Sequence, residues 1–501
     1  MRDGMNEIVA NRIAAPHGAT APSRCVLMIA CAFPPTGGPG VQRSLKFVKY
    51  LPTCGWMPTV WASEPLPGLP EDASLLSDIP SEVIVHRARQ DRAAQWTALI
   101  DRLSDAKAFS GVSMLDRGVA WVRAYRTRRL FPDDQTGWAR RSLVPLTRLM
   151  RDAPIDLIYS TFSPASNHWL ALQLKRRTGL PWVADFRDLW TDDYRYEEPS
   201  ARRRVAHRSL ENELLETADA VISVSDRQTE LLARRISRSA AKFYTITNGF
   251  DPDDIPPDKD REPGHKPRVF DDSEPDAACF TIAHVGRLDR RRTPNAFFQG
   301  LVRFVRAHES EPGRMVFESV GHVSDTVVDR LRATGLSVRR VGAVSHGDAI
   351  ARMQRADLLL LPVPQGPNAD SVIPAKLFEY LATGRPILVI GPNGGEAARM
   401  VTRCRAGRAV GFDGASFARA LSGFRDAWAA GRAPVGCAPD RLEPFNRIRL
   451  TQQLARVFDG LIERVSQRTT VETGVETGLS GQAAQTIGSS CSTMRHTPEV
   501  V

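Results

Sequence analysis

Short apolar runs alternate with helical patterns along almost the whole chain, and this alternation constrains the fold more than any other feature. In the first half, the runs with the length and composition of buried strands are 25–30, 58–63, 156–161, 182–186, 220–225 and 243–247. Helical patterns lie between them, and one of these, 168–179, ends at Gly179, a residue suited to ending a helix. Strands that alternate with helices predict parallel sheets covered by helices on both faces.

A second series of the same kind follows, with apolar runs at 280–286, 315–321, 338–342, 357–362, 386–391 and 406–412. Residues 250–278, between the two series, are rich in Asp and Pro, which is typical of a linker. The chain has 501 residues, which is too long for one ordinary core. We therefore predict an α/β protein with two doubly wound, Rossmann-like domains facing a central cleft.

The domain boundaries follow from these patterns. Apolar residues at helical spacing between 446 and 465 predict a final helix, and the polar stretch after it is typical of disorder. The predicted organisation is a flexible segment 1–23, a first domain 24–249 with a basic helical insertion at about 90–152, the linker 250–278, a second domain 279–440, a C-terminal helix 441–465 and a disordered tail 466–501.

Composition excludes several classes of protein. No apolar run approaches the ~20 residues of a membrane span, and residues 1–24 lack the apolar core of a secretory signal. The seven cysteines are odd in number and never spaced C-x-x-C, which argues against a disulfide framework or a zinc site. We therefore expect a cytoplasmic protein.

The formal charge of +10 suggests an anionic partner, and much of the excess lies within 117–151, where arginines accompany Trp121 and Trp138. This segment could lie on the anionic inner face of a membrane as a peripheral attachment. The alternative is an ordinary helix pair with solvated arginines. Since no nucleic-acid-binding motif accompanies the charge, we expect no nucleic-acid partner.

A glycine-rich turn, TGGPGVQRSLKF at 36–47, follows the first predicted strand. The dinucleotide fingerprint G-x-G-x-x-G fails here because Arg43 occupies the third glycine position. This departure argues against a redox enzyme. The turn could still present backbone N–H groups to an anion or a sugar hydroxyl, or it could be a simple turn without a ligand.

Polar side chains gather at predicted strand ends around the cleft. Arg287 and Arg292 follow the strand at 280–286 and could converge on one diphosphate, because the planar guanidinium binds phosphate oxygens in pairs. Lys376 and Glu379 lie one turn apart on a predicted helix, where the carboxylate could accept both hydroxyls of a ribose. Asn248 belongs to an Asn-Gly turn at the domain junction.

The chain resembles a GT-B glycosyltransferase of the family 4 type over roughly residues 24–465. The resemblance rests on motifs in that family's order: FPPTGGPGVQRSLKFVKYLPTCGW, VADFRDLW, TNGFD, VGRLDRRRTP, GAVSHGDAIARMQRADLLLLP and IPAKLFEYLATGRPIL.

The resemblance implies a retaining transfer from a nucleotide-sugar donor, bound by the second domain, to a glycan or lipid-linked acceptor, bound by the first, in polysaccharide or glycolipid assembly. It assigns Arg287 and Arg292 to the donor diphosphate and Glu379 to the donor ribose. Gly37 and Gly38 would approach the donor sugar or its phosphate. No obligatory metal or other cofactor is implied, and the D-x-D within 251–254 is interpreted as an acidic surface.

The sequence departs from the family pattern at two places. Ser371, beside Asp370, stands where the first glutamate of the E-x7-E motif is expected, so the sugar-facing contact would come from this residue or from N–H groups near 371–374. Arg187 stands where many relatives have a histidine near the reaction centre, flanked by Asp185 and Asp188.

We name Asp188, Arg187 and Asp185 as the catalytic candidates. The two aspartates could contact the donor sugar or an acceptor hydroxyl, or could pair with Arg187. His168 is a further candidate, although a lone histidine on a helix is more often structural.

Two other functions remain open. The chain could be a non-catalytic homologue that binds sugar nucleotides or serves as a partner subunit. It could also be a nucleotide-sugar epimerase of the same architecture, although the glycine-rich turn and the basic insertion would then be unexplained. The sequence does not disclose the nucleotide, the sugar, the acceptor or the oligomeric state.

Overall fold

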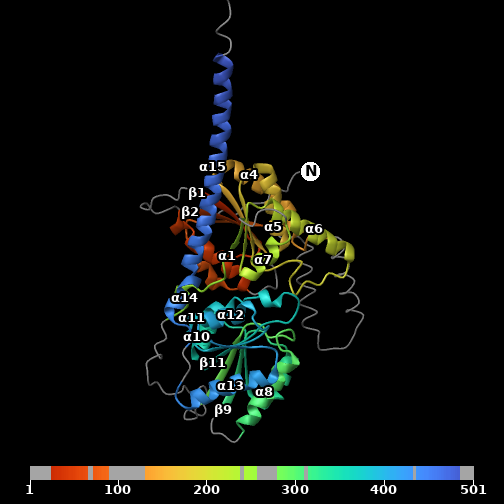
Figure 1. Cartoon of the computed structure of the whole chain (residues 1–501), viewed down its shortest axis with the longest axis vertical. Coiled ribbons are helices and arrows are strands. Elements are labelled where there is room, and N and C mark those ends of the chain that lie inside the picture. Colours follow the sequence, from red (N-terminus) through yellow and green to blue (C-terminus); the bar gives the residue numbers. More distant parts are fainter. Residues whose placement is uncertain are drawn as a thin grey trace, which may run out of the picture.

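The protein is represented by a computed structural model that describes residues 24–65, 71–89, 130–236, 242–256, 279–309, 314–432 and 436–485, with side chains in the last helix as far as residue 467. Two domains are stacked along the long axis, each with helices on both faces of a sheet (Figure 1). Both sheets consist entirely of parallel strands among the residues described. The predicted α/β architecture with two Rossmann-like domains is therefore confirmed.

The first domain has a seven-stranded sheet in the order β3-β2-β1-β4-β5-β6-β7. Its strands are β1 (Arg24–Ile29), β2 (Trp56–Ser63), β3 (Ile84–Ala88), β4 (Leu157–Phe162), β5 (Trp182–Phe186), β6 (Ala220–Ser223) and β7 (Phe243–Thr245). Its helices are α1 (Pro39–Tyr50), α4 (Thr136–Asp152), α5 (Ala165–Thr178), α6 (Ala201–Thr217) and α7 (Asp226–Ala233).

The second domain has a six-stranded sheet in the order β10-β9-β8-β11-β12-β13. Its strands are β8 (Cys279–Val285), β9 (Arg314–Val320), β10 (Ser337–Gly342), β11 (Leu358–Pro362), β12 (Ile387–Ile390) and β13 (Gly407–Val410). The helices are α8 (Asn295–Ala307), α9 (Asp325–Arg332), α10 (His346–Arg355), α11 (Lys376–Ala382), α12 (Glu396–Arg403), α13 (Gly414–Ala429), α14 (Pro439–Leu442) and α15 (Arg447–Gln485).

All the predicted strands are present, with ends that differ by a few residues. The sequence prediction missed β3, the edge strand of the first sheet. Its residues are exposed or half-buried, so it lacks the apolar run by which buried strands are recognised. The predicted end of the helix before Gly179 is confirmed, since α5 ends at Thr178 and Gly179 adopts a left-handed φ of 73°.

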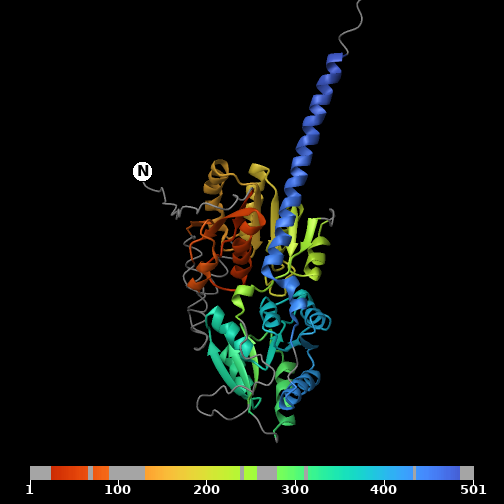
Figure 2. The ribbon, with the colours of Figure 1, turned by 90° about the vertical axis from the view of Figure 1, so that its left-hand side faces the viewer.

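Helix α15 returns from the second domain to the first. Leu450, Leu454, Phe458 and Leu461 are buried in the same apolar cluster as Val26 of β1. Both views show the helix running along the first domain and on past it (Figures 1 and 2). The chain therefore crosses between the domains twice, and the isolated bridge between Phe250 and Asn446 places the two crossings side by side.

Two predicted boundaries need correction. Helix α15 continues to Gln485, so residues 466–485 are helical rather than part of a disordered tail. A helix already nucleated by packing is extended at lower cost than a new one is started. The segment 250–256 is packed rather than linker, because Phe250 and Asp251 are buried. The rest of the predicted linker, 257–278, and the tail beyond 485 lie outside the described residues.

The basic insertion is described only from residue 130, so 90–129, including Trp121, lies outside the described residues. Trp138 on α4 is fully buried in the core of the first domain. It therefore cannot contact a membrane surface, which was one interpretation of this segment. Arg140, Arg141, Val144, Arg148 and Arg151 are exposed on the same helix. Among the residues that the structure describes, no helix is both long and apolar enough to span a bilayer.

Candidate active site

A cavity of about 610 Å³ lies between the two domains at the carboxyl ends of their strands, where open parallel sheets bind ligands. Eight of the predicted site residues line it: Gly38, Arg187, Asp188, Asn248, Arg287, Arg292, Lys376 and Glu379. Gly37, Asp185 and Ser371 are not among the lining residues. The cavity therefore brings together most of the candidates, from five separate parts of the chain.

The second domain supplies the basic wall of this cavity. Arg287 follows β8 and is exposed, and its guanidinium makes no hydrogen bond or ion pair with any residue in the described ranges. Arg292 pairs with Asp289 at 2.6 Å and donates to the Tyr194 hydroxyl of the first domain at 3.4 Å. Both residues line the cavity, and binding of phosphate oxygens by their guanidiniums stays a prediction.

Lys376 begins α11 and turns back onto the end of β8. Its Nζ donates to the carbonyl oxygen of Val285 at 2.5 Å and lies 3.1 Å from Nε2 of His284. Gly286 leaves room for it, since a Cβ there would lie 2.9 Å from this Nζ. Burial, reinforced by the positive charge of Arg292, lowers the pKa of Lys376 to about 7. Such a lysine gains charge when an anion enters.

Glu379 lies one turn further along α11. Burial raises the pKa of its carboxyl group, and Nε2 of His346 lies 3.9 Å from one of its oxygens. A hydrogen bond to Asp254 raises the pKa of His346. The carboxylate of Glu379 accepts no hydrogen bond from a described side chain, so it is available to a ligand hydroxyl.

Asp185 does not face the cavity, which corrects its expected catalytic role. Its carboxylate is fully buried and accepts from Arg43 Nε at 2.7 Å, Arg43 Nη2 at 3.0 Å and the Tyr159 hydroxyl at 2.5 Å. Arg43 also donates to the carbonyls of Ile246 and Thr247. The arginine that breaks the dinucleotide fingerprint is therefore part of a buried ion pair that ties α1 to β5 and to the segment after β7.

Arg187 and Asp188 remain at the cavity, on the side of the first domain. Arg187 Nη1 lies 3.3 Å from Asp188, whose other oxygen is 3.1 Å from Arg195. Arg187 also packs on Gly40, where a Cβ would come within 2.4 Å of its Nη2. The glycine-rich turn thus supports a guanidinium at this position, opposite the basic wall.

Ser371 is fully buried and turned away from the cavity, which corrects its expected role in donor binding. Its hydroxyl donates to the carbonyl of Asn368 at 2.7 Å. The N–H groups of Ser371 and Val372 donate to the carbonyls of Asn368 and Ala369, so these two are already used. His168 is also buried away from the cavity, with Nδ1 2.7 Å from the Ser160 hydroxyl, and burial lowers its pKa to about 3.

The D-x-D segment is an ion-pair cluster, neither a metal site nor a free acidic surface. Asp78, Asp251 and Asp254 are the one acidic group in the described part of the chain with metal-ligand spacing. Lys46 of α1 lies among all three, at 2.6, 2.6 and 2.9 Å. Its ammonium occupies the place that a cation would take.

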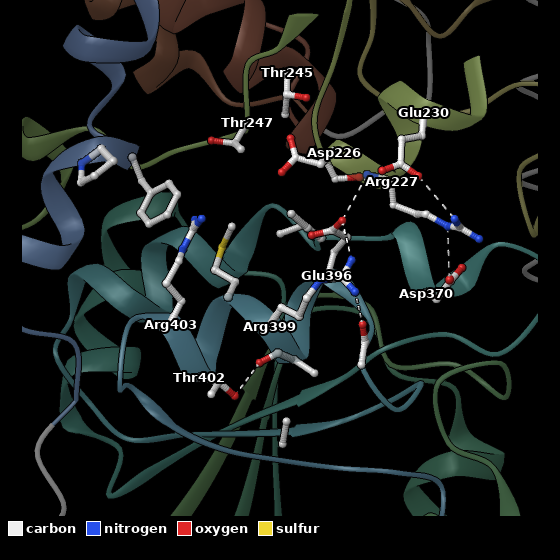
Figure 3. A pocket seen from close by; sticks show the side chains of 18 of the residues that line it. Asp226, Arg227, Glu230, Thr245, Thr247, Asp370, Glu396, Arg399, Thr402 and Arg403 are labelled. Carbon is white, nitrogen blue, oxygen red and sulfur yellow. Dashed lines mark hydrogen bonds and ion pairs between the residues drawn. The ribbon is translucent and has the colours of Figure 1, made fainter. Parts of the chain in front are cut away.

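A second, larger cavity of about 1140 Å³ is also lined by residues of both domains (Figure 3). Two ion pairs lie in its lining: Arg227 with Asp370 at 3.5 Å, and Arg399 with Glu396 at 2.7 Å. Glu396 also accepts from the backbone N–H of Arg227 at 3.1 Å, so a second-domain carboxylate caps first-domain helix α7. The hydroxyl of Ser225 donates to the Ser371 carbonyl at 2.8 Å. Through these contacts, Asp370, Ser371 and Glu396 of the second domain are bound to the first domain.

Sequence reasoning missed several lining residues, among them Tyr194, Arg195, His346 and Arg447. His346 stands within a quoted family motif and could have been singled out there. Arg447 gives no local signal, because it reaches the cavity only through the second crossing of the chain.

The glycosyltransferase family 4 model matches residues 47–254, which is most of the first domain. A comparison with curated proteins found no match. Three solved structures share the two-domain fold. Sucrose-phosphate synthase from Thermosynechococcus elongatus is 16% identical, with a TM-score of 0.61, 88% of this chain and 100% of that chain covered.

HepE from Anabaena, in complex with UDP and glucose, is 14% identical, with a TM-score of 0.55 and coverage of 87% and 100%. Trehalose 6-phosphate synthase from Burkholderia multivorans is 15% identical, with a TM-score of 0.54 and coverage of 89% and 100%. At these identities the structures show the fold. The glycosyltransferase family 4 match thus covers the first domain, and the solved structures add the shared two-domain fold.

Proposed function

We propose that this protein transfers a sugar, with retention of configuration, from a nucleotide-sugar donor to a glycan or lipid-linked acceptor in polysaccharide or glycolipid assembly. One observation carries the proposal. A single interdomain cavity has Arg287, Arg292 and Lys376 on one side and Arg187 with Asp188 on the other. HepE, which shares the fold, has been solved with UDP-glucose, and this supports a nucleotide-sugar donor.

The cations of the second domain would hold the donor diphosphate. When the bond between the anomeric carbon and the phosphate oxygen breaks, negative charge develops on the departing diphosphate. Cations fixed in a partly dry cavity stabilise that charge without reorganising. Arg287, Arg292 and Lys376 provide this stabilisation from the chain itself, so we propose a reaction without an obligatory metal.

The first domain would receive the acceptor. Asp188 is the one predicted catalytic carboxylate that reaches the cavity, and it is held between Arg187 and Arg195. We assign Asp188 to contact the donor sugar or the acceptor hydroxyl, and Arg187 to orient it. An acceptor carried by a membrane lipid would suit the exposed arginines of α4, so we further propose cytoplasmic, peripheral attachment to an anionic membrane.

The test is a binding and turnover screen of the full chain with UDP, GDP, ADP and their common sugar conjugates. Arg287→Ala and Glu379→Gln should lose binding of the preferred nucleotide. Arg290→Ala, in the same loop but outside the cavity lining, is the matched control and should bind normally.

Release or transfer of sugar that is lost in Asp188→Asn would support the assignment. Tight binding of a nucleotide sugar with no turnover towards any offered acceptor would favour a non-catalytic homologue. Interconversion of two donor sugars without transfer would indicate an epimerase, an activity named for one neighbour of this fold, a putative UDP-N-acetylglucosamine 2-epimerase from Listeria monocytogenes. Binding that ignores both substitutions would refute the proposal.

The membrane proposal has its own test. Each basic residue near an anionic surface contributes about 1 kcal/mol, so reversing two exposed charges, Arg140→Glu with Arg148→Glu, should abolish co-sedimentation with phosphatidylserine vesicles at low salt. Arg419→Glu, an exposed arginine on α13, is the control. Failure of the wild-type chain to sediment would refute this part alone.

A further inference from the structure

Arg447 is held in one place by the two crossings between the domains. It is the first residue of α15, and its backbone N–H donates to the carbonyl of Phe250 at 2.9 Å. The crossings lie so close that a Cβ on Gly249 would come within 2.1 Å of the Phe445 carbonyl oxygen. The backbone of Arg447 is therefore fixed, and its side chain lines the interdomain cavity.

The guanidinium of Arg447 lacks partners. The residue is 4% exposed, and its Nη1 is buried without a hydrogen bond. Within the described ranges, no carboxylate oxygen lies within 4.0 Å of this guanidinium. A buried guanidinium nitrogen without a partner is costly, because its N–H donors have lost water and gained no hydrogen bond in return. Because this nitrogen belongs to a residue of the cavity wall, a bound ligand can supply the missing partner.

In the same cavity, the carboxylate of Glu379 lacks a hydrogen-bond donor. Its buried carboxylate accepts no hydrogen bond from the described side chains, and the positive charge of Arg447 is one of those that act on it. The two groups thus lie near one another without forming an ion pair. The cavity is thus lined by a group that can only donate and by a group that can only accept.

The two side chains together define which ligand group would satisfy both. It must accept from the guanidinium and donate to the carboxylate, and a hydroxyl group does both. Glu379 lies one helical turn from Lys376 on α11 and lines the same cavity as Arg447. A diphosphate at Lys376 and Arg292 would therefore leave the sugar next to it, the ribose, beside Glu379 and Arg447.

We propose that Arg447 binds the ribose diol of the donor nucleotide. Its guanidinium donates a hydrogen bond to a ribose hydroxyl oxygen, and the same hydroxyl group donates a hydrogen bond to the carboxylate of Glu379. This inference rests on the proposed nucleotide-sugar function and adds a binding residue from α15, outside both Rossmann-like sheets. The nucleotide would then contact the helix that joins the second domain to the core of the first.

The experiment compares Arg447→Gln with the wild-type full chain by calorimetric titration. The probes are whichever of UDP, GDP or ADP binds the wild type, and the 2′,3′-dideoxy analogue of that nucleotide. Loss of a hydrogen bond from a charged group should weaken binding of the ribonucleotide by about ten- to a hundred-fold. The dideoxy analogue, which lacks both hydroxyls, should bind the variant and the wild type equally.

Arg449→Gln is the matched control, since Arg449 lies two residues further on and pairs at the surface with Glu443 at 2.9 Å. If Arg447→Gln does not fold, Arg447→Lys, which keeps the charge and loses the planar fork, is measured in the same way. Equal weakening of both probes would place Arg447 on the phosphates or in a purely structural role and would overturn the inference. Unchanged binding of both probes would also overturn it. If no nucleotide binds the wild type, it is the proposed function that fails.

Discussion

The substitution Asp185→Asn tests whether the carboxylate of Asp185 has a structural or a catalytic role. The substitution keeps the size of the side chain but replaces one carboxylate oxygen by an NH₂ group. That group can only donate, and it would face the guanidinium of Arg43, which also can only donate. Of the three hydrogen bonds to Asp185, at 2.7, 3.0 and 2.5 Å, the amide can keep those to its remaining oxygen.

The expected cost comes from the charge left behind. Arg43 is 1% exposed, and its neutralising partner would be lost. Removing one member of a buried ion pair destabilises a protein by about 3–5 kcal/mol. In a domain of about 200 residues each kcal/mol lowers the melting temperature by about 2–4 °C, so we expect a decrease of about 10 °C.

The assay is thermal unfolding followed by circular dichroism, with sugar turnover measured well below the melting temperature. Asp188→Asn is the matched control: its carboxylate is 32% exposed, so its stability should change by less than about 1 kcal/mol while turnover falls. An Asp185→Asn protein that melts like the wild type but has lost turnover would refute the assignment of Asp185 to the buried ion pair.

Three further substitutions test the junction and the basic wall. Lys46→Met leaves the buried carboxylate of Asp251 short of one partner and should lower the free energy of unfolding in urea by about 3 kcal/mol; an unchanged value would contradict the ion-pair account. Glu396→Ala removes the carboxylate at the N-terminus of α7, which should cost about 1 kcal/mol and increase the radius of gyration in X-ray scattering as the domains separate; an unchanged radius would show that this contact does not hold them. Lys376, with a pKa of about 7, is mostly neutral at pH 8.5, so diphosphate binding should take up a proton there and none below pH 6, an uptake that calorimetry in two buffers measures and that Lys376→Met should abolish.

The sequence predicted the features that local pattern determines. Apolar runs located the strands of both sheets, and strand-end position placed Arg287, Arg292 and Glu379 at one cavity, because the carboxyl ends of parallel strands share an edge. The edge strand β3 was missed because half-exposed strands carry no continuous apolar run.

The errors concern side-chain direction, which depends on distant partners. Asp185 and Asp188 are three residues apart, yet Asp185 points at Arg43, 142 positions away in the sequence, while Asp188 reaches the cavity. Arg447 approaches Glu379 only after the chain has folded back across the junction. Such long-range pairings leave no periodicity in one sequence.

The return of α15 has a consequence for synthesis on the ribosome. The core of the first domain includes Leu450, Leu454 and Phe458, which emerge only after the entire second domain has been made. N-terminal domains generally fold first during synthesis, but this one would wait with one face of its sheet partly uncovered. A chain that stopped short of α15 would expose that apolar face, so premature termination should produce aggregates in place of a soluble first domain.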